Sequence, residues 1–198
     1  MNRYLKASVT LLPLLIVLCA GQMCAQENDG SAFGAPVVKF SSFAGKSAIL
    51  AGGRFGWAID KNIVLGGGIY GLVNKVKTGI IDPLSGQDVL LGFNCGGLEL
   101  EYIFFPDSKI HASVDMFLAG GGLTYAVSDK SVNHTNYFSN DLLLWEPQLS
   151  IEFEIVDWFH INTGVSYRII TSYEIANGIS RDDLKGISAL LTFKFGRY

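Results

Sequence analysis

Apolar and polar residues alternate at every second position through most of the chain after residue 25, where no stretch has a convincing helical period. The clearest case is residues 142–155, LLLWEPQLSIEFEI, in which one parity is apolar and the other carries Glu146, Glu152 and Glu154. Such alternation places the two sets on opposite faces of a β-strand. At 14 residues the strand exceeds the five or six usual in soluble proteins, and a tilted strand needs about 9 to 11 to cross a bilayer.

Tight turns and longer polar connections alternate along the chain. The tight turns centre on Asp60, Asp107 and Asp157, and the longer connections cover 74–88, 128–140 and 172–183. An even number of strands with short turns at one end and longer loops at the other is typical of an antiparallel, up-and-down transmembrane β-barrel. Closure into a barrel also pairs every backbone group, as a bilayer requires. We therefore predict an all-β, eight-stranded barrel with strands near 36–44, 48–59, 63–73, 89–104, 110–126, 142–155, 159–170 and 185–197.

The polar parity of these strands predicts a charged barrel interior. With Asp157 at the centre of its turn, Glu154 lies opposite His160, and Glu146 lies opposite Arg168. Eight strands enclose a lumen about wide enough for its own side chains, so we expect a plug of polar side chains and not a channel. Buried charges must be paired, and we predict one lumen charge network formed by Arg54, Glu99, Glu101, Asp115, Glu146, Glu152, Glu154, His160, Arg168 and Lys194.

The hairpin LELEYIFFPDSKIHASVDMF at 98–117 adds one condition. Its polar residues on both strands lie inside only if the turn at 106–109 has an odd length or contains a bulge.

Aromatic residues gather near both ends of the predicted strands, as in the two interfacial girdles of membrane barrels. The first set, near the tight turns or the C-terminus, is Trp57, Tyr102, Phe104, Phe105, Trp158, Phe159, Phe193 and Phe195; the second is Tyr70, Tyr125, Trp145, Tyr167 and Tyr173.

Residues 1–25 have the pattern of a cleaved signal peptide. Arg3 and Lys6 precede the apolar run LLPLLIVLCA, and a small-residue cleavage site ends at Ala25, with Ala20 as the alternative. We then expect a periplasmic lead-in at 26–35 and a barrel domain at 36–198. Cys95 would be the only cysteine left after cleavage, so an internal disulfide is excluded.

Composition agrees with a membrane environment. Hydrophobic residues make up 49% of the chain and charged residues 17%, against about 25% charged in an ordinary soluble domain. The net charge is −3 and there is no basic run, which argues against nucleic acid as a partner.

On these features and on its last strand, KGISALLTFKFGRY, the chain resembles the small eight-stranded outer-membrane β-barrel proteins of the porin-like superfamily. Ser188, Phe193 and Phe195 fit the polar and aromatic positions of the C-terminal signal that the barrel-assembly machinery reads in such proteins. Leu190 stands where that signal has glycine, and residues 196–198 extend past its usual end. The resemblance implies a monomer in the bacterial outer membrane, with outer-membrane lipid, lipopolysaccharide and the assembly machinery as partners and with no cofactor. It implies no single activity.

Few residues of the sequence suggest a catalytic, cofactor or metal site. His111 and Ser113 form a His-x-Ser pair like that of lipid A deacylases, which are also outer-membrane barrels, although their parity with Asp115 also fits a lumen lining. GGGIYG at 66–71 matches G-x-G-x-x-G but lacks the following helix of a dinucleotide site. The histidines have no compact ligand spacing, so we predict no metal site; Asp129, Asp141 and Asp183 in or near the loops could hold cations weakly.

Three functions remain open. The first is a non-catalytic outer-membrane barrel that acts structurally or binds partners through its extracellular loops. The second is a lipid A-modifying enzyme that uses His111 and Ser113. The third is a soluble secreted barrel that carries a small apolar ligand, which requires Glu146, Glu152 and Glu154 to point outward.

Overall fold

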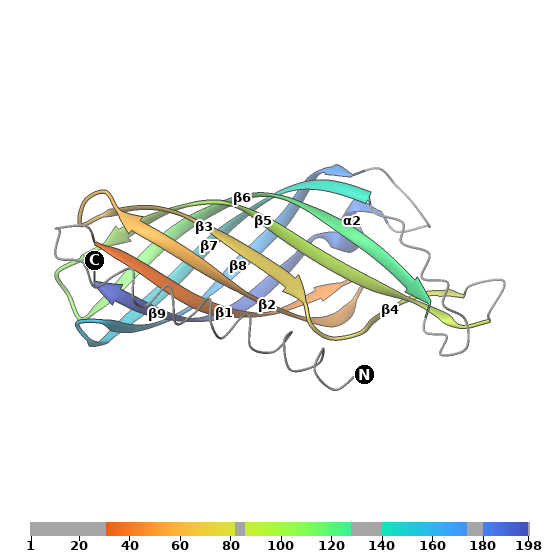
Figure 1. The fold of residues 1–198 in the computed structure, drawn as a ribbon, viewed down its shortest axis with the longest axis horizontal. Coiled ribbons are helices and arrows are strands. Elements are labelled where there is room, and N and C mark those ends of the chain that lie inside the picture. The colour runs from red at the N-terminus through yellow and green to blue at the C-terminus, as the bar shows by residue number, and fades with distance from the viewer. Residues whose placement is uncertain (1–30, 82–85, 128–139, 174–179, 198) are drawn as a thin grey trace, which may run out of the picture.

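The computed structural model describes residues 31–81, 86–127, 140–173 and 180–197. The expected signal peptide lies outside these ranges. The described residues form one antiparallel sheet in the order β3-β2-β1-β9-β8-β7-β6-β5-β4, which closes through an additional β3–β5 pairing (Figure 1). The elements are β1 (Ala32–Phe43), β2 (Lys46–Ala58), β3 (Ile63–Leu72), β4 (Val76–Ile81), β5 (Asp88–Phe104), β6 (Ile110–Val127), β7 (Asn140–Val156), β8 (Phe159–Tyr173), α2 (Arg181–Leu184) and β9 (Gly186–Arg197).

The predicted eight-stranded, up-and-down barrel is confirmed, with β4 as a continuation of β3. Both strands pair with β5, and the chain breaks between them at 73–75. At the break, the Asn74 amide accepts a hydrogen bond from the backbone N–H of Ile49 and donates one to the carbonyl of Ser47. The side chain thus satisfies backbone groups of β2 that no strand covers there. No helix in the described ranges has both the length and the apolar character needed to cross a membrane.

The two ends of the barrel differ in their connections. The turns at 59–62, 105–109 and 157–158 and the end of β9 lie at one end, and the strand ends that flank the longer connections lie at the other, together with the short β1–β2 connection (Figure 1). The β5–β6 connection contains five residues, 105–109, so it has the odd length that the hairpin required. Glu101 and Asp115 are direct partners in this register, and both are buried. Phe105 opens the connection with φ of 57°, a conformation that bulky residues rarely adopt.

Several boundaries depart from the sequence prediction. β1 begins at Ala32, four residues before the expected barrel start and inside the expected lead-in, because Ala32–Ala35 already pair with β2, and Ala32 and Gly34 also pair with β9. The connection predicted at 172–183 contains α2, which Ser180 and Asp183 begin with a reciprocal capping box. Leu184 at the end of α2 is fully buried.

The barrel is apolar outside and charged inside. Leu98 and Ile69 on the outer wall are 68% and 70% exposed, whereas Lys194 in the lumen is 0% exposed. This is the reverse of a water-soluble fold, in which large apolar side chains point inward. Glu146 and Glu152 point into the lumen, against the requirement of the soluble-carrier hypothesis.

The lumen is layered, which the expectation of a wholly polar plug did not include. A large apolar cluster fills the half nearer the long connections, and Phe43, Phe93 and Leu144 are among its members. A smaller one, made of Phe33, Ala35, Val64 and Ile103, lies near the tight turns. Most of the buried charges lie at the level of this smaller cluster, since Arg54 is the register partner of Ala35 and Glu101 that of Val64.

Aromatic residues follow the predicted girdle near the tight turns, and at the other end Tyr167 of the second predicted set is also exposed on the outer wall. Near the tight turns, Trp57 and Trp158 are exposed on the outer wall, and Trp158 stacks on Phe195. The placement of Tyr70 and Tyr125 in a second girdle was wrong, because both side chains are buried in the lumen. Tyr70 lies six residues after the buried Val64 on one strand and therefore shares its inward face.

Candidate functional site

Arg54 of β2 is the centre of the lumen charge cluster. Its Nε lies 3.0 Å from Glu99 Oε2, one terminal nitrogen lies 2.8 Å from Glu101 Oε2, and the other lies 3.3 Å from Asp115 Oδ1. All four side chains are nearly inaccessible to solvent. The planar guanidinium can serve three carboxylates at once, which a lysine ammonium at the same place could not do with the same geometry.

Lys194 of β9 extends the cluster toward the tight turns. Its Nζ lies 2.8 Å from Glu101 Oε1 and also pairs with Glu152 Oε2. The other oxygen of Glu152 lies 3.3 Å from His111 Nε2 and 3.1 Å from His160 Nδ1. The structure therefore brings together side chains from β2, β5, β6, β7, β8 and β9, and His111 joins the residues that the sequence placed in the network.

A second buried pair lies apart from this cluster. Lys39 Nζ is 2.7 Å from Glu146 Oε1, which also accepts a hydrogen bond from the Ser166 hydroxyl. The ammonium lies 4.1 Å from the centre of the Tyr70 ring. The sequence reasoning missed Lys39, although its parity on β1 with the inward-facing Val37 was a usable signal.

Besides Glu146, two more residues of the predicted network lie outside the cluster around Arg54. Glu154 is half-exposed next to the β7–β8 turn and takes no part in the described ion pairs. Arg168 is buried, but its Nε donates to the carbonyl of Leu184 at 2.7 Å and a terminal nitrogen donates to the carbonyl of Ser42 at 2.9 Å. Its guanidinium also stacks on Phe43 at 4.0 Å. Arg168 thus fixes the mouth of the barrel and does not pair with Glu146.

The His-x-Ser pair does not have the geometry of an activated serine. His111 Nε2 faces Glu152 and Nδ1 lies 3.2 Å from the Ser108 carbonyl, whereas the Ser113 hydroxyl donates to Asp115 Oδ2 at 3.3 Å. The histidine is therefore committed to partners other than the serine. Both side chains are buried in the lumen, so lipid chains outside the barrel do not reach them.

The glycine motif and the candidate cation-binding aspartates have no binding-site geometry in the described residues. GGGIYG lies within β3, with no helix after it. Asp183 caps α2, Asp141 is exposed on β7, and Asp129 lies outside the described residues. Among the described residues, no group of three or more His, Cys, Asp or Glu side chains could hold a metal ion.

Two ion pairs on the surface lie next to the long connections, one between β4 and β5 and one at α2. Lys77 Nζ lies 2.8 Å from Asp88, and this hydrogen bond raises the pKa of Lys77. Lys185 pairs with Asp182 in the same way at 2.7 Å, and the hydrogen bond raises the pKa of Lys185. Both pairs are exposed, so they orient loops more than they stabilise the barrel.

The residues of the predicted assembly signal lie on opposite faces of β9. The Ser188 hydroxyl points inward and donates to Ser41 Oγ at 2.9 Å. Phe193 and Phe195 point outward, with ring centres 6.4 and 5.0 Å from that of Phe159. Recognition of this strand by the assembly machinery stays a prediction.

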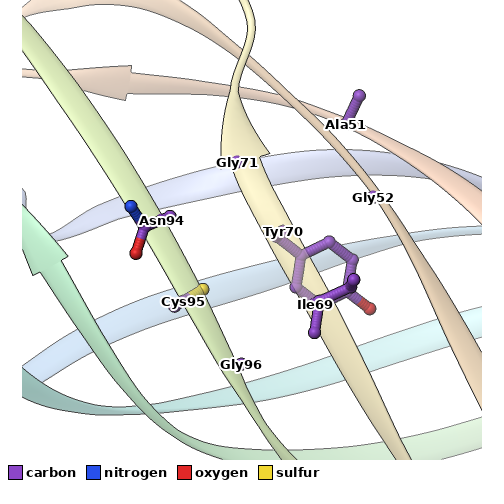
Figure 2. A pocket seen from close by; sticks show the side chains of 8 residues that line it. All are labelled: Ala51, Gly52, Ile69, Tyr70, Gly71, Asn94, Cys95 and Gly96. Atoms are coloured by element: carbon purple, nitrogen blue, oxygen red, sulfur yellow. The ribbon is translucent and has the colours of Figure 1, made fainter. Parts of the chain in front are cut away.

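A shallow groove of about 460 Å³ lies on the outer wall across β2, β3 and β5 (Figure 2). Ala51, Gly71 and Asn94 are register partners in one row of this wall, and all three belong to the outward parity. The groove arises because small side chains leave the wall bare there. None of its lining residues belongs to the charge cluster inside.

No family model and no curated protein matches the chain. Its structure is similar to the crystal structure of Neisserial surface protein A, with a TM-score of 0.60, 9% identity, and coverage of 86% of this chain and 98% of that one. It is also similar to Ail, the attachment invasion locus protein of Yersinia pestis, solved in complex with the heparin analogue sucrose octasulfate. That match has a TM-score of 0.52 and 8% identity, and covers 85% of this chain and 97% of Ail. The closed sheet and these likenesses together show that the chain has the fold of the small eight-stranded outer-membrane β-barrels.

Proposed function

We propose that this chain is a non-catalytic outer-membrane β-barrel protein that acts structurally or binds partners through its long connections. The observation that carries the proposal is the reversed polarity of the wall. Leu98 and Ile69 are among the most exposed large side chains, and Arg54 and Glu101 are among the most buried. A bilayer stabilises the first set and leaves the second in a closed, paired interior.

The long connections are the parts of the molecule best suited to a partner. The β1–β2, β2–β3, β5–β6 and β7–β8 connections contain two to five residues, whereas 82–87, 128–139 and 174–185 are longer. Binding residues concentrate on loops that a rigid scaffold positions. The similarity to Ail supports this use of the fold, since that protein is named for attachment and was crystallised with a sulfated ligand.

Membrane insertion is testable with cysteine labelling in outer-membrane fractions. Cys95 is first replaced by serine, and Leu98→Cys is compared with Asp107→Cys in a tight turn. A membrane-impermeant maleimide, applied to opened membranes, should label Asp107→Cys rapidly and leave Leu98→Cys protected. Heat-modifiable migration on gels confirms that both variants are folded. Equal labelling, or recovery of the chain as a freely soluble periplasmic protein, would refute insertion.

The enzymatic alternative has its own test. Cells that overproduce the chain should contain unchanged lipid A, because Ser113 is buried and hydrogen-bonded to Asp115. Deacylated lipid A that disappears with Ser113→Ala would refute the non-catalytic assignment.

A further inference from the structure

His111 lies at the start of β6, between the β5–β6 connection and the charge cluster. Its ring is buried, with Nδ1 3.2 Å from the carbonyl oxygen of Ser108 and Nε2 3.3 Å from Glu152 Oε1. A carbonyl and a carboxylate only accept hydrogen bonds, whereas a neutral imidazole has a single N–H. Both contacts are electrostatically favourable only when the ring carries two protons. In either neutral tautomer, one nitrogen lone pair would face an oxygen.

The charges around His111 favour the same protonation state. The cluster contains two permanent cations, Arg54 from β2 and Lys194 from β9. They face four carboxylates, namely Glu99 and Glu101 from β5, Asp115 from β6 and Glu152 from β7. His160 from β8 is the other titratable group, and it shares Glu152 Oε1 with His111. When all four carboxylates are ionised and both imidazoles are neutral, two negative charges remain uncompensated, which is costly in a buried site.

We propose that His111 is an imidazolium that acts as a proton-held latch, tying the connection at 105–109 to β7 through Ser108 and Glu152. The β6–β7 pairing starts beside this point, where the backbone N–H of Glu154 donates to the Lys109 carbonyl at 2.9 Å. Loss of the proton removes one donor and adds net negative charge to the cluster. The connection then loosens, and water enters the lumen from the tight-turn end.

The direction of the pH effect follows from linkage. The folded state binds the proton more tightly than the unfolded chain, because only the folded state supplies the two acceptors. The latch therefore stabilises the fold fully below about pH 6.5, the ordinary value for histidine, and is lost as the pH rises further. Loss of a charge-assisted hydrogen bond should raise the unfolding equilibrium constant by about tenfold to a hundredfold.

The protonation state is measured directly by NMR of the full chain, labelled with ¹⁵N-histidine and refolded in detergent micelles. At pH 7 the His111 ring should show two protonated nitrogens, and His111→Gln assigns the signal. A neutral His111 ring at pH 7 would overturn the proposal. This measurement does not depend on any variant being stable.

The mechanical consequence is measured by urea unfolding at several values between pH 5.5 and pH 9. The wild type should lose stability with rising pH, and His111→Gln should lose much less. Ser188→Ala is the matched control, because Ser188 is also buried in the lumen but bonds to Ser41 away from the charge cluster, and this variant should keep the wild-type dependence. If His111→Gln keeps the full dependence while Asp115→Asn removes it, the proton resides on Asp115 and the latch is refuted.

Discussion

Replacing Arg54 with methionine removes the cation that three buried carboxylates share. Methionine keeps much of the apolar stem, so the change isolates the charge and its hydrogen bonds. Glu99, Glu101 and Asp115 lie 2.8 to 3.3 Å from the guanidinium, and all are buried. Breaking a buried ion pair by removing one partner costs about 3–5 kcal/mol, because the other charge stays buried without compensation. We expect Arg54→Met to lower the free energy of unfolding by at least this amount.

The assay is reversible urea unfolding of the barrel in lipid vesicles. Tryptophan fluorescence and heat-modifiable migration on gels follow the same samples. The matched control is Lys61→Met, since the Lys61–Asp107 pair has a distance of 2.6 Å but is largely exposed to solvent. Exposed pairs contribute little, so the control should unfold at the wild-type urea concentration within error.

A second substitution distinguishes lost charge from lost packing. Glu99→Gln in the Arg54→Met background removes a carboxylate whose described ion pair is with Arg54, and should restore part of the lost stability. The coupling between the two substitutions then measures their interaction. The reasoning is refuted if Arg54→Met is as stable as Lys61→Met, or if Glu99→Gln lowers stability further by an independent amount.

Three further substitutions test other parts of the molecule. Leu98→Arg puts a charge on a wall position that is 68% exposed, and should cost about 2–4 kcal/mol of unfolding free energy in vesicles; unchanged stability would argue against lipid contact. Gly121→Ala puts a Cβ 2.3 Å from a carbonyl oxygen of β5 and should cost about 1–3 kcal/mol or more in urea unfolding, whereas Gly120→Ala meets nothing within 4 Å. Equal effects at the two glycines would contradict the register. Arg168→Met frees the carbonyl of Leu184 and should speed amide hydrogen exchange in α2, while unchanged exchange there would show that Arg168 does not hold the helix.

Local rules predicted the strands and their faces well. Alternation alone identified residues 142–155, and the turn centred on Asp157 gave the register in which Glu152 lies opposite Asn162. The strand assignment depends on the two-residue period of a β-strand, and the register depends on the short turn that joins the two neighbouring strands. The same reasoning placed Arg54, Glu99, Glu101 and Asp115 inside, because a strand that is apolar on its outer face has only one face left for charges.

Contacts across the lumen were beyond such rules. Lys39 pairs with Glu146 although β1 and β7 are not adjacent in the sheet, so the pairing depends on the tilt and stagger of the closed barrel. Arg168 sits at the register position opposite Glu146, yet its guanidinium goes to the carbonyls of Ser42 and Leu184. The positions of α2 and of the end of β1 decided that outcome. The Ser180-x-x-Asp183 spacing was the local signal for this helix.

The order of apolar and charged side chains along the lumen affects whether ions could pass through the barrel. The apolar cluster, with Phe43 and Leu144 among its buried members, separates the charge cluster from the end that carries the long connections. The buried Leu184 and the guanidinium of Arg168 over Phe43 close that end within the described residues. Ions that crossed such a lumen would have to leave their hydration shells among buried apolar side chains, which is costly. The charge cluster lies beyond this section, toward the tight turns, where His111 is placed. This order of layers supports the proposed binding at the long connections over passage through the lumen.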